Sequence, residues 1–159
     1  MADGRALAGA RLGRRAWLIW LQVVLVAVLA YALVLVVAGG LATDLFALFG
    51  FGPSPEIDTP AVRAYLALPT MVLGAVLAGW AALMISLVRG PLRDGAPWAL
   101  PAITRALILW FLLDTGMSIV LGVPTHALFN VPFAIALGIP LWRLRVDDAH
   151  GTVASPGGR

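Results

Sequence analysis

The sequence predicts an all-α protein, a four-helix transmembrane bundle whose two termini both lie in the cytoplasm (N-in/C-in). Hydrophobic residues make up 61% of the 159 residues and charged residues only 12%, whereas soluble domains average about 45–50% apolar and about 25% charged residues. Four long apolar runs alternate with short segments rich in glycine, proline and charge. Roughly 20 apolar residues suffice for a helix to cross a bilayer, so each run is a predicted span.

The first span is predicted over residues 17–38, behind a cytoplasmic N-terminal segment, residues 1–16, that contains several arginines. Its apolar run is longer than the roughly 7–15 residues of a signal-peptide core, which favours a helix that is retained. The alternative is a signal peptide cleaved near residues 38–40, because small residues follow the apolar run there.

An outer loop, residues 39–61, separates the first span from the second, because glycine and proline cluster in it. Within this loop, Thr43 is placed to cap a short helix over residues 43–49 that lies on the membrane surface. The second span is predicted over residues 62–88, with Pro69 available as a kink near its start.

A polar turn over residues 89–97 leads into the third span, predicted over residues 98–122. Residues 122–125 contain glycine and proline and predict a tight hairpin to the fourth span, residues 126–142. The remaining residues, 143–159, are polar and end in serine, proline and glycine, which predicts a disordered cytoplasmic tail.

The distribution of arginine predicts the orientation. All but one of the arginines lie in the N-terminal segment, near the second connection or in the tail, whereas Arg63 lies beside the outer loop. Cytoplasmic connections carry the excess of arginine in membrane proteins, so both termini are placed in the cytoplasm. Tryptophan rings settle at membrane interfaces, and four of them fall at the same predicted interface: Trp17, Trp20, Trp98 and Trp142.

Asp114 is the most informative residue, because it lies inside the third span. An ionisable group near the bilayer centre costs about 2.5–3.5 kcal/mol on insertion scales and marks a functional hypothesis by default. At about 1.5 Å per residue, Asp114 lies roughly 12 Å below the outer end of its span. The same arithmetic places Tyr31, Thr70 and Asn130 at similar depths in the other three spans.

Two further residues extend this predicted polar layer. Ser118 lies one helical turn further out on the face of Asp114, and His126 lies one turn before Asn130 in the fourth span. His126 is interpreted either as an interface residue or as part of the same cavity.

Three interpretations of the polar layer are open. In the first, the side chains hold the helices together through hydrogen bonds of about 0.6 kcal/mol each, and burial keeps Asp114 in its neutral form. In the second, the layer is a ligand or proton site open to the outer face, where Asp114 titrates or binds a cation. In the third, Asp114 reaches toward the headgroups without a partner.

Small residues recur every four positions in the second span and predict a helix-packing stripe. Small side chains let two helix backbones approach closely in a membrane, so the stripe is expected to face a helix of this chain or of another copy. It consists of Gly74, Ala78, Ala82 and Ser86.

Several kinds of chemistry find no support in the sequence. The chain has no cysteine, which excludes disulfides, thiolate metal sites and dithiol redox chemistry. Its two histidines are placed so that two-histidine haem ligation within the bundle is excluded, and Glu56 and Asp58 are too generic a pair to indicate a metal. Phosphate-binding loops, nucleophile elbows and paired catalytic carboxylates are absent. We therefore expect no metal, no cofactor, no nucleic-acid partner and no enzymatic activity.

One combination of motifs resembles a known group of proteins. It comprises residues 74–80 (GAVLAGW), residues 110–118 (WFLLDTGMS), and Gly122 followed by Asn130. Over about residues 62–142 this combination resembles a group of small, uncharacterised four-span bacterial membrane proteins. The resemblance implies a four-helix integral protein of the bacterial inner membrane and assigns no activity.

The function predicted from these features is a non-enzymatic structural or accessory component of a bacterial cytoplasmic membrane. Its expected partners are the lipid bilayer and a second copy or another membrane protein. The alternative is a small oligomeric transporter or binder of a lipophilic or cationic compound that uses Asp114, and an intramembrane enzyme comes third. A transporter or binder needs a cavity that reaches Asp114, whereas an accessory protein needs none.

Overall fold

The computed structural model describes residues 2–40, 44 and 59–153. In this part of the chain the secondary structure is entirely helical, which confirms the predicted all-α fold. The elements are α1 (Ala2–Val37), α3 (Pro60–Leu87), the π-helix η1 (Val88–Leu92), α4 (Ala99–Val120) and α5 (Pro124–Val153). Each of the four long helices contains a segment that is long and apolar enough to cross a membrane, so the chain is a multi-pass membrane protein.

One prediction at the ends of the helices is wrong: α5 continues to Val153, so that residues 143–153 of the predicted disordered tail are helical. Helix α1 begins at Ala2 and thus extends well before the predicted span over residues 17–38. The prediction counted apolar residues, but alanine, leucine and arginine favour a helix on either side of the membrane boundary, and Leu144 is completely buried. Residues 154–159 and the predicted surface helix at 43–49, Asp44 excepted, lie outside the described residues.

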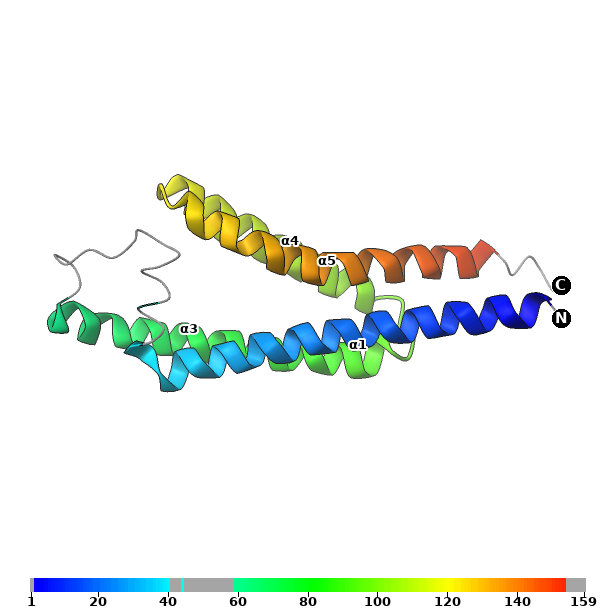
Figure 1. Ribbon diagram of the computed structural model, residues 1–159, viewed down its shortest axis with the longest axis horizontal. Helices are drawn as coiled ribbons and strands as arrows, with labels where there is room; N and C mark the ends of the chain where they lie inside the picture. Colours follow the sequence, from blue (N-terminus) through cyan, green and yellow to red (C-terminus); the bar gives the residue numbers. More distant parts are fainter. Residues whose placement is uncertain (1, 41–43, 45–58, 154–159) are drawn as a thin grey trace.

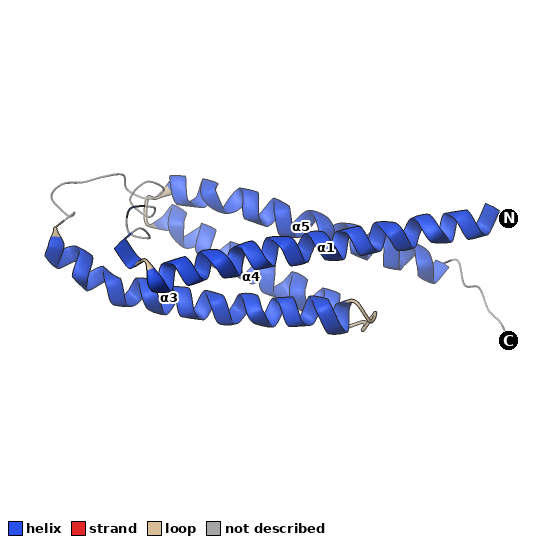
Figure 2. Cartoon of the chain, turned by 60° about the horizontal axis from the view of Figure 1, so that its bottom comes forward, coloured by secondary structure: helices blue, strands red, loops and turns tan. Residues whose placement is uncertain are grey.

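The four long helices are arranged as two hairpins. Figures 1 and 2 show α1 lying along α3, and α4 lying along α5. Helix α1 also packs against α5, whereas α3 and α4 barely touch. The first turn of α1 and the last turn of α5 lie at the same end of the bundle (Figure 1), which we call the terminal end. The side of the membrane that this end faces stays a prediction.

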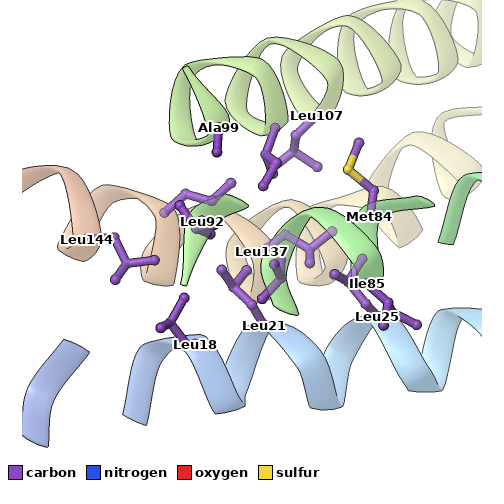
Figure 3. Close-up of a cluster of buried hydrophobic side chains, with 13 residues drawn as sticks. Leu18, Leu21, Leu25, Met84, Ile85, Leu92, Ala99, Leu107, Leu137 and Leu144 are labelled. Atoms are coloured by element: carbon purple, nitrogen blue, oxygen red, sulfur yellow. The ribbon is translucent and has the colours of Figure 1, made fainter. Parts of the chain in front are cut away.

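The hydrophobic core lies in the half of the bundle near the terminal end. Leucines of α1 and α5 meet side chains of α3, η1 and α4 there, as Figure 3 shows. Leu21, Leu92 and Leu144 are among its fully buried members. Many other large apolar side chains, such as Val23 and Leu109, are more than half exposed, and in a bilayer these side chains contact acyl chains.

A close approach of two backbones joins α1 to α3. A Cβ atom added to Gly74 would lie 2.8 Å from the carbonyl oxygen of Ala32 and 2.8 Å from the Cβ of Leu35. Only glycine fits between the helices at this point, so Gly74 packs against a helix of its own chain, as one of the two sequence-based alternatives expects.

The rest of the predicted packing stripe is only partly at this interface. Ala78 is half-buried, whereas Ala82 and Ser86 are exposed in the single chain, so their packing against a helix stays a prediction. A helix has about 3.6 residues per turn, so each four-residue step rotates the side chain by about 40° and carries the later members away from α1. The buried line of α3 instead contains Thr70, Gly74, Ala81, Met84 and Ile85.

A single hydrogen bond helps α1 dock on α5. Pro140 lies inside α5 and has no backbone N–H, so the carbonyl of Ala136 one turn earlier lacks its helical donor. The indole Nε1 of Trp20 in α1 donates a hydrogen bond to this carbonyl at 2.9 Å. Backbone polar groups at membrane depth need such partners, because no water reaches them.

The turn between α4 and α5 is as tight as the sequence predicts. Gly122 adopts a left-handed backbone conformation, with φ of 74°, which residues with a Cβ rarely adopt. Its amide donates to the carbonyl of Ile119 at 3.0 Å, and the amide of Val123 donates to the carbonyl of Ser118 at 2.8 Å. These bonds end α4 and start α5 within a few residues, which brings the first turn of α5 beside the last turns of α4.

Candidate functional site

A cavity of about 340 Å³ lies between the two hairpins, in the half of the bundle away from the core. In this half the hairpins diverge (Figure 1), and all four long helices contribute to the cavity wall. Binding pockets for small molecules start at about 300 Å³, so the cavity is large enough for a small ligand. Most of its wall is aliphatic or aromatic.

Four of the six predicted polar residues line this cavity. They come from α1, α4 and α5, and they are Tyr31, Asp114, His126 and Asn130. The structure therefore brings together residues that the sequence related only by their depth and, for His126, by its helical spacing from Asn130.

The other two predicted residues lie elsewhere. Thr70 is buried one turn from Gly74 on α3 and does not line the cavity. Ser118 is also buried, and its hydroxyl donates to the backbone carbonyl of Asp114 at 2.7 Å. Thr70 was placed in the layer by depth alone, which does not fix the direction in which a side chain points. Ser118 was placed there because it lies one turn from Asp114, but its hydroxyl binds the backbone of its own helix.

Asp114 and His126 form a pair across the α4–α5 hairpin. His126 Nε2 lies 3.3 Å from Asp114 Oδ1, and the side chains are 25% and 35% exposed, respectively. The tight turn at Gly122 makes this contact possible, because it sets the first turn of α5 against α4. Asp114 therefore has a polar partner, contrary to the interpretation in which it reaches the headgroups alone.

Asn130 holds the same two helices together one turn deeper. Its Nδ2 atom donates to the hydroxyl of Thr115 at 3.3 Å, and the residue is only 3% exposed. This bond is of the kind that the helix-joining interpretation expects.

The aromatic part of the wall was missed by reasoning from the sequence. Trp80 from α3 and Trp110 from α4 line the cavity, together with Phe129 and Phe133 from α5. The rings of Phe129 and Phe133 lie 5.4 Å apart, edge to face. The sequence did contain a signal for the two tryptophans. Both lie inside apolar runs, far from the membrane interfaces where tryptophan is usual.

A spacing signal was also available on α5. His126, Phe129 and Phe133 recur at intervals of three and four residues, which places them on one helix face. The rings of His126 and Phe129 are stacked, with centroids 6.4 Å apart. The face therefore presents a continuous series of rings to the cavity, with a carboxylate at one end.

This arrangement suits the recognition of an organic cation. The faces of tryptophan, tyrosine and phenylalanine rings attract positive charge, and Asp114 provides a carboxylate beside them. In the described part of the chain, no three metal-ligating side chains gather at one point.

Comparisons with known proteins assign neither a family nor a function. No family model, no curated protein and no solved structure matches this chain. The resemblance to small four-span bacterial membrane proteins stays a prediction, and the functional argument rests on the geometry of the cavity.

Proposed function

We propose that this protein binds a small lipophilic cation in the cavity between its two hairpins, with Asp114 as the counter-charge. The observation that carries the proposal is the cavity of about 340 Å³ that reaches Asp114 and is walled by aromatic rings. The finer localisation belongs to the same proposal: a bacterial cytoplasmic membrane, with both termini in the cytoplasm.

Electrostatics supports a cationic ligand over a neutral one. Charges interact more strongly in the low-dielectric interior than in water, and a desolvated cation gains about 2 kcal/mol over an aromatic face. The Asp114 carboxylate places a negative group in the cavity wall, beside the imidazole of His126. A ligand with one positive group and an apolar body would match both the charge and the wall.

An accessory role accounts less well for the cavity. A protein that only holds its helices together gains most from close packing, because each unfilled volume forfeits contacts between side chains. The first hairpin shows such packing at Gly74. The space beside Asp114 is better explained by a ligand that fills it.

The proposal requires only one chain, because α1, α3, α4 and α5 of a single copy all line the cavity. Transport of the ligand across the membrane would need a continuous pathway, and a bundle of only four helices has little room for one. The proposal is therefore a binding protein, and assembly into an oligomer stays a prediction.

The test uses the full chain in nanodiscs of a zwitterionic lipid, with benzyltrimethylammonium as the probe and titration calorimetry as the measurement. We expect saturable binding that Asp114→Asn weakens about tenfold or more, because the amide keeps the shape of the side chain but loses its charge. Neopentylbenzene has the shape of the probe without its charge. Its affinity should therefore be the same for the unsubstituted chain and for Asp114→Asn.

The matched control is Asp94→Asn, which removes a carboxylate from the exposed turn between α3 and α4. Binding should be unchanged in this variant. Equal affinity in Asp114→Asn and Asp94→Asn, or the absence of saturable binding to the unsubstituted chain, would contradict the proposal and favour the accessory role.

A further inference from the structure

A second cavity is a groove in the α4–α5 hairpin, lined only by residues of these two helices. Its volume is about 330 Å³, and it shares no lining residue with the cavity beside Asp114. Its wall is apolar along most of its length, with Leu107, Ile108 and Phe111 on the α4 side. Thr104, Trp142 and Arg145 line its end nearest the terminal end of the bundle.

The depth of this groove matches one leaflet of a bilayer. At about 1.5 Å per residue, Arg145 lies roughly 32 Å along α5 from Pro124, about the full thickness of the hydrocarbon core. With Pro124 at one membrane surface, Arg145 therefore lies at the headgroups of the other. Ala134 lines the opposite end of the groove, roughly 16 Å deeper than Arg145 and close to the middle of the bilayer.

The floor of the groove is formed by small residues of α5. A Cβ atom added to Gly138 would meet no other atom within 4 Å, so the space above this glycine is open. Gly138 and Ala134 are one helical turn apart and both line the groove. An extended, narrow, apolar chain fits such a floor without displacing a side chain.

The end of the groove near the membrane surface carries positive charge. Among the described residues, no carboxylate lies within ion-pairing distance of Arg145. The neighbouring Arg143 is engaged with two rings, because its guanidinium lies 5.0 Å from the ring centroid of Trp142 and 6.0 Å from that of Trp17. Arg145 is therefore the basic group that remains available at the groove.

From these observations we infer that the α4–α5 groove is a binding site for one anionic phospholipid. An acyl chain lies over Gly138 and Ala134, and the phosphate accepts hydrogen bonds from the guanidinium of Arg145. Basic pockets between transmembrane helices bind anionic headgroups on general electrostatic grounds, and Arg145 supplies the complementary charge here. The length of the groove, one leaflet deep, favours a lipid over a packed helix, which would continue across the whole bilayer.

Native mass spectrometry of the full chain tests this site. The chain is equilibrated in detergent with equal amounts of dioleoyl phosphatidylglycerol and dioleoyl phosphatidylcholine, which have identical acyl chains. We expect one retained lipid, with phosphatidylglycerol preferred. Arg145→Gln should lower this preference about fivefold, because it removes one basic contact with the headgroup. Gly138→Leu should reduce the retention of both lipids, because its side chain occupies the open floor.

Two matched controls separate the groove from the general surface. Arg105→Gln removes an exposed arginine that neighbours Thr104 in sequence but does not line the groove, and it should keep the lipid preference. Gly79→Leu adds the same side chain at another open glycine, on α3, and should keep the retained lipid. Ala134→Leu fills the deep end of the groove and serves as a second variant if Gly138→Leu does not fold.

Three outcomes would overturn the inference. Equal loss of preference in Arg145→Gln and Arg105→Gln would assign the effect to overall surface charge. Unchanged lipid retention in both Gly138→Leu and Ala134→Leu would place the lipid elsewhere. A dimer in place of a lipid adduct, lost in Gly138→Leu, would show that the groove is covered by a second copy.

Discussion

Trp20 shows how a single side chain can repair a helix that proline interrupts. The sequence assigns this residue to the membrane interface, which accounts for its amphipathic ring but not for its partner. In the structure its indole N–H donates to the carbonyl of Ala136, the group that Pro140 leaves without a helical donor. The partner could not be predicted, because it depends on how α1 is rotated relative to α5.

Replacing Trp20 by phenylalanine should lower the free energy of unfolding by about 1 kcal/mol, within the range measured for hydrogen bonds between membrane helices. The loss should nearly vanish in a Pro140→Ala background, because alanine at this position restores the helical N–H. Reversible unfolding in mixed micelles measures both values. Trp98→Phe is the control, since the Trp98 side chain is exposed and its indole N–H donates no hydrogen bond to a described residue. If Trp20→Phe lowered the free energy of unfolding by the same amount with alanine as with proline at position 140, the hydrogen bond to the Ala136 carbonyl would not be the cause.

Asp114 marks both the strength and the limit of residue-by-residue prediction. Its chemistry identified a functional candidate, because a carboxyl group at that depth needs a reason to be there. Its depth also selected Tyr31 and Asn130, and His126 was added because it lies one helical turn before Asn130. All three line the same cavity. Depth in the membrane does not show toward which side of its helix a residue points, however. Thr70 was therefore included although it does not line the cavity.

At the scale of elements, the glycines of α3 provide a matched pair. A Cβ atom at Gly74 would collide with the backbone of α1, whereas one at Gly79 would meet nothing within 4 Å. Gly74→Ala should therefore lower the free energy of unfolding by about 1–3 kcal/mol, the usual cost of overpacking. Gly79→Ala should leave it unchanged or raise it by up to about 1 kcal/mol, because alanine favours a helix. The same measurement of unfolding applies, and equal values for the two variants would mean that α1 and α3 do not approach closely.

The existence and order of the membrane helices were predictable, and their ends were not. Length and hydropathy locate the part of a helix inside the bilayer, because only that part must be apolar. They are silent about residues 2–16 and 143–153, where the helices continue beyond the apolar runs. Burial of Leu144 against the core is a tertiary effect that no apolar run reveals.

At the scale of the whole molecule, the orientation can be tested with single cysteines, because the chain has none of its own. The arginine distribution predicts that the α3–α4 turn faces the cytoplasm and the α4–α5 turn faces outward. An impermeant maleimide added to intact cells should label Thr125→Cys and not Asp94→Cys. Permeabilised cells, in which both sites should react, provide the control, and labelling in the reverse pattern would invert the bundle.

The arrangement of the two hairpins was also beyond sequence reasoning. Apolar faces in a membrane contact either lipid or another helix, so the hydrophobic pattern does not select the buried face. The cavity exists because the hairpins meet at one end and diverge at the other (Figure 1). Trp80 and Trp110 gain their place in its wall from that divergence, and their positions in the sequence record only that they lie inside apolar runs.

The core contains residues of both α1 and α5, and this determines when it can form during biosynthesis. Of the four long helices, the ribosome makes α1 first and α5 last. Leu18, Leu21 and Leu25 belong to α1, and the core leucines of α5 are Leu137, Leu141 and Leu144. Membrane helices insert before they associate, so the leucines of α1 must wait for α5 before the core can close. Each hairpin can form as soon as its two helices are inserted, but this four-helix bundle is completed only when α5 has been synthesised.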